Sequence, residues 1–167
     1  MNWRAWAYSG AVTVIDTSRA AFQVVVFPFR REGDGFVYAL LRRQDAGYWQ
    51  GAAGGGEVGE SPLQAARREA CEEAGVGDGA VFVVLDARTT VPVVAVTGEF
   101  TWGPEVLVIP EYAFGAGVES AELRLSEEHT EYCWFGFDQA SKAVKWDSNR
   151  TALWELDHRL RHRAGSA

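Results

Sequence analysis

The sequence contains little cysteine, no long apolar run and fewer basic than acidic residues. Its two cysteines, Cys71 and Cys133, form neither a CxxC pair nor a disulfide framework, so we expect reduced thiols in a cytoplasmic protein. No stretch approaches the roughly 20 apolar residues that cross a bilayer, and residues 1–16 lack the basic cluster and cleavage site of a secretion signal. We therefore expect no membrane partner.

The charge balance excludes one large class of partner. A formal net charge of -7 is unsuited to binding a nucleic acid polymer, because that attraction requires clustered lysine and arginine. A small anionic substrate is compatible with the sequence if local arginines or a bound metal offset the field of the whole protein. With 167 residues, of which 47% are hydrophobic, the chain is predicted to form a single domain over residues 1–167.

Short apolar and β-branched segments predict an α+β fold built on a sheet of five or more strands. Residues 22–28 and 36–43 are typical of a hairpin closed by a turn at 31–35. A glycine-rich segment follows at 44–56, and we expect it to be a loop with unusual backbone freedom. Further strands are predicted at 80–88, 91–97, 104–114 and 132–137.

Two helices are predicted near the C-terminus. The first covers 138–144 with Asp138 as its cap, and the second covers 147–163 behind a cap at Ser148 or Asn149. Leucines at helical spacing mark the packed face of the second helix: Leu153, Leu156 and Leu160. Residues 1–20 form an extension whose structure the sequence does not indicate.

A further helix is predicted between Ser61 and Gly75. Serine at the N-cap, Pro62 at the first helical position and Gln64 as the partner of a capping box give it a strong start. Gly75 supplies the stop. Its apolar stripe is mostly alanine, which permits a close approach to the sheet: Leu63, Ala66, Ala70 and Ala74.

The same helix carries three acids that disfavour one another. Glu69 faces Glu72 at i+3 and Glu73 at i+4, and each like-charge pair costs a few tenths of a kcal/mol. The last helical turn also disfavours negative charge by about 0.3 to 1 kcal/mol. A divalent cation among the carboxylates resolves the conflict. The alternative is a solvated, salt-bridged face, but that does not explain the glycines before the helix or the acids Glu57 and Glu60.

Residues 54–76 resemble the signature of the Nudix hydrolases, Gx5Ex7REUxEExGU, in which U is aliphatic. Seven fixed positions agree, and Val76 closes the pattern; chance would produce this on the order of 10⁻⁸ times per starting position. The matching residues are Gly54, Glu60, Arg68, Glu69, Glu72, Glu73 and Gly75. Ala70 departs mildly, since a larger aliphatic residue is usual there. The flanks at 40–55 and 126–156 resemble the dihydroneopterin triphosphate and nucleoside triphosphate pyrophosphatase branch, and the likeness covers about residues 22–160.

The resemblance implies a fold and a chemistry. We expect a mixed β-sheet between α-helices, with residues 54–76 forming loop, helix and loop over a metal site. The implied activity is a Mg²⁺-dependent (Mn²⁺ being possible) cleavage of a nucleoside triphosphate or dihydroneopterin triphosphate into a monophosphate and pyrophosphate. Two alternatives stay open: hydrolysis of a dinucleoside polyphosphate or nucleotide sugar, and a nucleotide-binding sensor without turnover. The protein would act as a monomer or a homodimer.

The resemblance also implies roles for acidic residues. Glu69, Glu72 and Glu73 become metal ligands, Ala53 adds its carbonyl, and Glu57 is an auxiliary ligand. Glu60 is expected to pair with Arg68 and hold the loop against the helix. The base that deprotonates the attacking water is Glu73, Glu69 or Glu128, with Glu127 as the rival of Glu128. His129 is interpreted as a polar loop residue.

The substrate-binding residues are predicted from side-chain chemistry and the flanking likeness. Arg43, rather than Arg42, is expected to contact a phosphate. Tyr48, Trp49 and Trp146 are candidates for stacking on a flat base or pterin. Because the chain has seven tryptophans, core packing is an equal explanation for these rings.

Overall fold

The structure, a computed structural model, describes residues 18–164. The strands are β1 (Arg19–Glu32), β2 (Gly35–Arg43), β3 (Trp49–Gln50), β4 (Ala52–Glu57), β5 (Val81–Pro92), β6 (Val108–Gly117) and β7 (His129–Gly136). The helices are α1 (Pro62–Ala74), α2 (Val93–Thr97), α3 (Phe137–Ala143) and α4 (Asp147–Ala164). No helix within this range has the length and apolarity needed to span a membrane.

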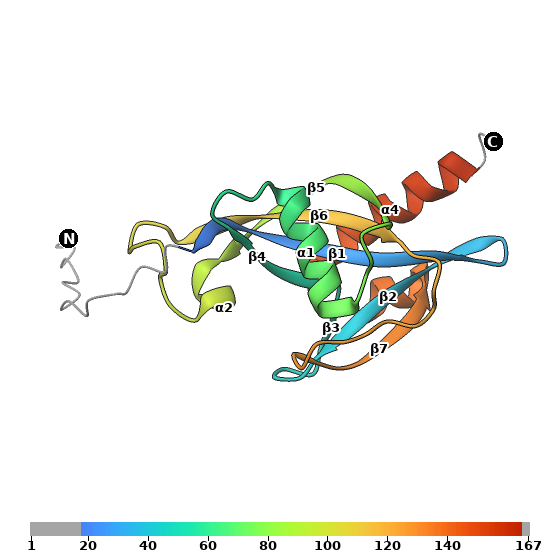
Figure 1. Ribbon diagram of the computed structural model, residues 1–167, viewed down its shortest axis with the longest axis horizontal. Coiled ribbons are helices and arrows are strands. Elements are labelled where there is room, and N and C mark those ends of the chain that lie inside the picture. The colour runs from blue at the N-terminus through green and yellow to red at the C-terminus, as the bar shows by residue number, and fades with distance from the viewer. Residues whose placement is uncertain (1–17, 165–167) are drawn as a thin grey trace, which may run out of the picture.

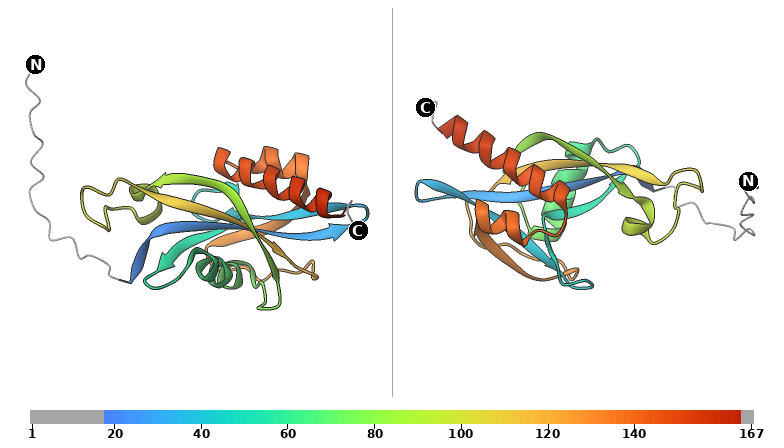
Figure 2. Two further views of the ribbon diagram at one scale, coloured as in Figure 1. Left: turned by 90° about the horizontal axis from the view of Figure 1, so that it is seen from above. Right: turned by 180° about the vertical axis from the view of Figure 1, so that it is seen from behind.

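The strands of residues 18–164 form one seven-stranded mixed sheet. Its order is β3-β2-β1-β6-β5, with β4 pairing to β1 and β7 pairing to β2. Strands β1 and β6 run parallel, whereas the pairs of β1 with β2 and β4 are antiparallel. Helix α1 covers one face, and α3 and α4 cover the other (Figures 1 and 2). The predicted α+β architecture, a mixed sheet between helices, is confirmed.

Two apolar cores lie on the two faces of the sheet because successive strand residues alternate between them. Val24 and Val26 face the alanine stripe of α1, whereas Val25 and Phe27 face α4. The predicted leucine face of α4 is buried in the second core: Leu153, Leu156 and Leu160. The long strand β1 is therefore covered on both sides, and α1 is fixed directly against it.

The predicted start and stop of α1 are confirmed. The Ser61 side chain accepts from the Gln64 amide while the Gln64 side chain accepts from the Ser61 amide, which completes the capping box. Gly75 ends the helix in the left-handed conformation with a φ of 67°. Ala66, Ala70 and Ala74 are fully buried, so α1 lies close to the sheet and its acids lie close to β4.

The glycine-rich segment differs from the prediction, because much of it is strand rather than loop. Strand β4 pairs with β1, placing Ala53 beside Val25 and Gly54 beside Val24. Glycine permits this strand because other side chains lie directly over its backbone. A Cβ at Gly54 would overlap the Glu69 carboxylate, and one at Gly56 would overlap the Phe22 ring.

The predicted strand at 91–97 is wrong. Strand β5 ends at Pro92, which lacks an amide for a ladder, and residues 93–97 form the short helix α2 ended by Gly98 in the left-handed conformation. A short valine-rich run does not distinguish strand from helix by periodicity alone. The strand expected from 104 also begins later, at Val108.

Three predictions about element ends need correction or fall outside the structure. Asp138 lies in the first turn of α3 and is not its cap, which is Gly136 without a side-chain hydrogen bond. Helix α4 begins at Asp147, so Ser148 and Asn149 lie inside its first turn. Of the extension at 1–20, residues 1–17 lie outside the described part, and Arg19 already belongs to β1.

Candidate active site

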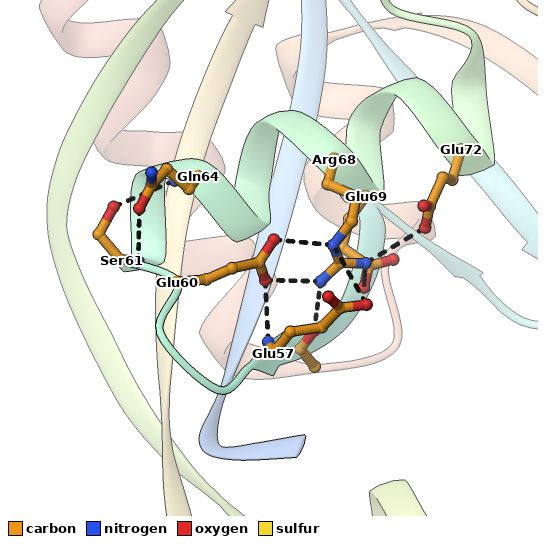
Figure 3. Close-up of polar contacts among 8 residues, drawn as sticks. Glu57, Glu60, Ser61, Gln64, Arg68, Glu69 and Glu72 are labelled. Atoms are coloured by element: carbon orange, nitrogen blue, oxygen red, sulfur yellow. Dashed lines mark hydrogen bonds and ion pairs between the residues drawn. The ribbon is translucent and has the colours of Figure 1, made fainter. Parts of the chain in front are cut away.

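Arg68 connects the end of β4 to the acids of α1 (Figure 3). Its Nε and Nη2 atoms donate to the two Glu60 oxygens, each at 2.9 Å, and Nη2 also donates to the Gly55 carbonyl at 2.8 Å. Its Nη1 atom contacts Glu69 Oε1 at 2.7 Å and Glu72 Oε2 at 3.2 Å. The expected pair of Arg68 and Glu60 is thus present, and the same guanidinium partly neutralises two of the motif acids.

Glu57 lies at the edge of this network. Its backbone amide donates to Glu60 Oε2 at 2.8 Å, whereas its carboxylate is exposed and lies 3.9 Å from Arg68 Nε. The backbone of Glu57 therefore helps to hold the turn between β4 and α1. Its side chain is free to face solvent or an incoming ligand.

Glu69 and Glu73 are not on a solvated face, since their residues are only 8% and 5% exposed. Glu73 Oε2 accepts from the Ala53 amide at 2.7 Å. Burial raises the pKa of both carboxyl groups, that of Glu73 to about 8, and repulsion from Glu128 acts in the same direction. Ionisation of this face of α1 therefore costs free energy in the absence of a cation.

Glu128 comes from the turn before β7 yet lies near the motif acids. Its negative charge raises the pKa values of Glu69 and Glu73, which places it in the same electrostatic environment. Arg43 Nη1 donates to Glu128 Oε2 at 2.9 Å. Glu127 is exposed, and of these two neighbours it is Glu128 whose charge is among the main causes of the raised pKa values of Glu69 and Glu73. The structure thus brings Glu128, the residue chosen from the flanking likeness, to the site.

Arg43 ends β2 and is held by two acids. Its Nε and Nη2 atoms donate to the two Asp45 oxygens at 3.1 and 2.8 Å, in addition to the Glu128 contact. The hydrogen bonds that Arg43 donates to Asp45 raise the pKa of Arg43 further above its usual range. Arg42 instead contacts Glu131 at 2.7 Å and the Gly47 carbonyl. Of the two arginines, Arg43 is the one that contacts Glu128, and its charge opposes the rise in the pKa of Glu73.

Two of the three predicted stacking residues form an aromatic pair. The rings of Tyr48 and Trp146 meet edge to face with centroids 5.9 Å apart, and Trp146 is 44% exposed. Lys145 Nζ lies 4.6 Å from the Tyr48 ring centroid and 4.8 Å from that of Trp146. Trp49 instead contacts Phe135 and packs against the core on the α4 side.

Sequence reasoning missed Lys145 and Asp45 as members of these clusters. Lys145 sits beside Trp146 in the chain, and a cation next to an aromatic residue was the available signal. Asp45 lies two residues after Arg43, but the turn that points its carboxylate back at the guanidinium is visible only in the structure.

His129 also differs from its interpretation as a polar loop residue. It begins β7 and is only 6% exposed, with Nδ1 at 3.5 Å from Ser126 Oγ. Its Nε2 atom is buried and has no hydrogen-bond partner among the described residues. Burial and the Arg43 charge lower its pKa, so the neutral imidazole is favoured.

The oxygen-rich donor set fits a hard cation such as Mg²⁺ or Mn²⁺. Two carboxylates are buried without full compensation, and Gly54 leaves room for the Glu69 oxygens against the backbone. In the part of the chain that the structure describes, however, no three His, Cys, Asp or Glu side chains are grouped as a ready metal site. Arg68 holds Glu69 and Glu72, and Ala53 holds Glu73. An ion would therefore replace Arg68 as the partner of Glu69 and Glu72.

Comparison with known proteins agrees with this geometry. Residues 18–154 match the NUDIX domain. The chain is 33% identical over 108 residues to the asymmetrical bis(5'-nucleosyl)-tetraphosphatase of Sus scrofa, covering 65% of this chain and 69% of the pig protein. A NUDIX hydrolase structure from Listeria monocytogenes superposes with a TM-score of 0.76 at 35% identity, covering 85% of this chain and 95% of that one.

A more distant structure shares the fold. The dihydroneopterin triphosphate pyrophosphohydrolase of E. coli gives a TM-score of 0.68 at 22% identity, covering 85% of this chain and 98% of that one. The family match extends across β1 to α4 and includes the network around Arg68. The chain therefore belongs to the NUDIX domain family and is a Nudix hydrolase.

Proposed function

We propose that this protein is a cytoplasmic, Mg²⁺-dependent pyrophosphohydrolase that cleaves a nucleoside triphosphate or dihydroneopterin triphosphate to a monophosphate and pyrophosphate. The observation that carries the proposal is the buried pair Glu69 and Glu73, which faces further negative charge from Glu128. These carboxylates could bind a divalent cation together with a polyphosphate, because the cation offsets the negative charge of both the carboxylates and the phosphates.

Glu69, Glu72 and Glu73 would hold the ion, with the Ala53 carbonyl and Glu57 as further oxygen donors. When bound, the ion neutralises phosphate charge and lowers the pKa of a bound water. Arg68 keeps Glu60 and the Gly55 carbonyl in place. The turn between β4 and α1 would therefore stay fixed while Arg68 releases Glu69 and Glu72 to the ion. Positioning of this kind is a large part of phosphoryl-transfer catalysis.

Arg43 and Glu128 would act on the substrate and the attacking water. The planar guanidinium of Arg43 suits a bidentate contact with a phosphate, which would replace Glu128 or Asp45 as its partner. Once released from Arg43, Glu128 is the proposed base that takes the proton of the water. Glu69 and Glu73 are the alternative bases.

Tyr48, Trp146 and Lys145 would bind the ring and phosphate ends of the substrate. The exposed Trp146 offers a face for stacking, and Lys145 adds a positive charge beside it. Trp49 is less suited to this role, because its ring contacts Phe135 and the core.

A second candidate is the asymmetrical cleavage of a dinucleoside tetraphosphate. The observation that favours it is the 33% identity to the pig bis(5'-nucleosyl)-tetraphosphatase over 108 residues. Both reactions need the same acids and cation, and they differ in the leaving group. The chemistry of the motif does not choose between them.

Product analysis separates the two candidates. The purified chain is incubated with Mg²⁺ and each of GTP, ATP, dihydroneopterin triphosphate and diadenosine tetraphosphate, and the products are resolved by anion exchange. Pyrophosphate and a monophosphate from a triphosphate support the first candidate, whereas ATP and AMP from diadenosine tetraphosphate support the second. The absence of hydrolysis with every compound, in Mg²⁺ and Mn²⁺, would refute the proposed activity.

A further inference from the structure

A cavity of about 200 Å³ lies on the α4 face of the sheet, opposite α1. Figure 2 shows α4 crossing this face of the sheet, and the cavity is bounded by residues from its first turns. Small apolar side chains, Val25, Ala87 and Ala113, line part of the cavity. Glu111 and Ser148 add polar groups to the wall. The size suits one heterocyclic ring rather than a whole nucleotide.

Glu111 is the unusual member of this wall. It lies within β6, between Gln23 of β1 and Thr89 of β5, and is only 7% exposed. Ser148 Oγ donates to Glu111 Oε1 at 3.3 Å, and this is its hydrogen-bond partner among the described residues. No ion pair of that part of the chain includes Glu111.

Burying a carboxyl group in a central strand without a cation costs free energy. The burial raises the pKa of Glu111, and the Ser148 hydrogen bond opposes that shift only in part. An apolar residue of similar volume would fill the site at lower cost. A carboxyl group that opens onto a cavity instead can accept hydrogen bonds from a ligand.

The cavity lies two strands from β4, the strand whose Ala53 amide holds Glu73. Val25 pairs with Ala113 on one side and with Ala53 on the other, so Ala113 and Ala53 are two strand spacings apart, roughly 10 Å. The Ala53 amide holds Glu73. In addition, Asn149 Oδ1 lies 3.5 Å from the Gly51 amide, which joins the start of α4 to the approach to β4. The cavity and Glu73 lie on opposite faces of the sheet, so a ligand with its ring at Glu111 would have to pass around β4, which pairs with β1, to place its phosphates near α1.

We infer that Glu111 recognises the 2-amino-4-oxo edge shared by guanine and pterin rings. This inference rests on the proposed hydrolysis of a triphosphate and names its ring. The edge presents two adjacent N–H donors, one from the ring and one from the exocyclic amine, and these match the two oxygens of a carboxylate. Adenine presents an acceptor beside its donor, which would leave a Glu111 oxygen facing a lone pair.

The cavity and the aromatic pair contribute differently to binding. Trp146 directly precedes Asp147, the first residue of α4, so both features lie at the same end of this helix. Stacking tolerates every base because each has a π face. We therefore assign the choice between ring types to Glu111. Trp146 contributes affinity for any flat ring.

Glu111→Gln tests the inference, because glutamine keeps the size of the side chain but presents one acceptor and one donor. The kcat/KM for GTP is expected to fall about 10- to 100-fold, mostly through KM, from the loss of a bidentate contact. The kcat/KM for ATP should change by less than about threefold, which is the scale of a neutral surface substitution. Glu119→Gln is the matched control, since it makes the same change at an exposed side chain outside the cavity lining.

Binding of GMP, AMP and neopterin, followed by tryptophan fluorescence without divalent ions, supplies a readout that does not need turnover. Weaker binding of GMP and neopterin to Glu111→Gln, with unchanged AMP binding, supports the inference even if the wild-type chain hydrolyses no triphosphate. An unchanged preference between GMP and AMP overturns it, whatever the activity. Parallel assays with GTP and dihydroneopterin triphosphate then show which ring is the better substrate.

Ser148→Ala keeps the inference testable if Glu111→Gln disturbs folding. Removal of the hydroxyl that orients Glu111 should weaken GMP binding about 2- to 10-fold, the usual scale of one hydrogen bond, without changing AMP binding. Thermal melts of both variants check the fold. Equal losses for GMP and AMP in Ser148→Ala would contradict the assigned role.

Discussion

Replacement of Glu73 by glutamine should stabilise the protein without divalent ions while it abolishes most activity. Burial raises the pKa of the folded Glu73 to about 8, whereas an unfolded glutamate titrates near 4.3. Between these values the folded state binds more protons than the unfolded state. The free energy of unfolding therefore decreases as pH rises from about 4.3 to about 8, and it levels off above that.

The size of the effect follows from the shift in pKa. At 1.36 kcal/mol per pKa unit, a rise from about 4.3 to about 8 has an upper bound of about 5 kcal/mol. Local relaxation and water entry reduce such penalties, so we expect a gain of about 1 to 3 kcal/mol for Glu73→Gln at pH 8.5. In the wild-type chain the Ala53 amide donates to Glu73 Oε2 at 2.7 Å, and the glutamine oxygen can still accept this hydrogen bond.

Urea unfolding at pH 5 and pH 8.5, in the presence of a chelator, measures this difference. Glu72→Gln is the matched control because it removes the same charge from the same helix, but its side chain is 58% exposed. Its stability should differ from wild type by less than about 0.5 kcal/mol at both pH values. If Glu73→Gln and the wild-type chain show parallel dependence on pH, the reasoning about buried negative charge is wrong.

Metal binding should reverse the order of stability. Saturating Mg²⁺ stabilises the folded state by RT ln(1 + [Mg²⁺]/Kd), and the wild-type chain should gain more than Glu73→Gln because it keeps all its carboxylates. The kcat of Glu73→Gln should fall by at least about 100-fold with Mg²⁺. A variant that gains as much from Mg²⁺ as the wild-type chain would exclude Glu73 as a ligand.

Other substitutions test the remaining parts of the site. Glu128→Ala should lower kcat by about 100-fold and Glu127→Ala by less than threefold; steady-state assays compare them, and the reverse order would move the role to Glu127. Gly54→Ala should lower both thermal stability and activity because its Cβ would overlap Glu69, whereas Gly79→Ala, where the space is open, should leave both unchanged. Trp146→Ala should raise KM for GTP and ATP by a similar factor of about 5 to 100, because stacking on the ring is lost. A change in KM for only one of the two nucleotides would refute the role of Trp146 in stacking on any base.

Local sequence signals were enough to predict α1. The N-cap, proline, capping box and terminal glycine act within a few residues of one another, so Ser61 and Gly75 bound the helix as expected. The hairpin of β1 and β2 was predictable for the same reason. The arrangement of the sheet and helices was predicted from the resemblance to the family, because no local pattern indicates it.

Tertiary contacts account for what the sequence did not predict. The sequence predicted the acids of α1 as metal ligands but not their burial: Glu69 and Glu73 are buried because β4 lies beside them and Gly54 leaves room there. The strand β4 itself was read as loop, since its glycines carry no strand propensity of their own. Glu111 was counted only as part of a strand, because alternation along β6 cannot reveal a cavity under α4.

The guanidinium of Arg68 touches four partners at once, two on the β4 side and two on α1. Because Arg68 is part of the chain, its positive charge offsets Glu69 and Glu72 in the folded protein before any ion binds. If the proposed ion binds these acids, its loading would be an exchange between a tethered cation and a diffusing one, and metal affinity would depend on how firmly Glu60 and Gly55 retain the arginine. Evolution could thus tune how readily the ion leaves with product by altering residues that never touch it.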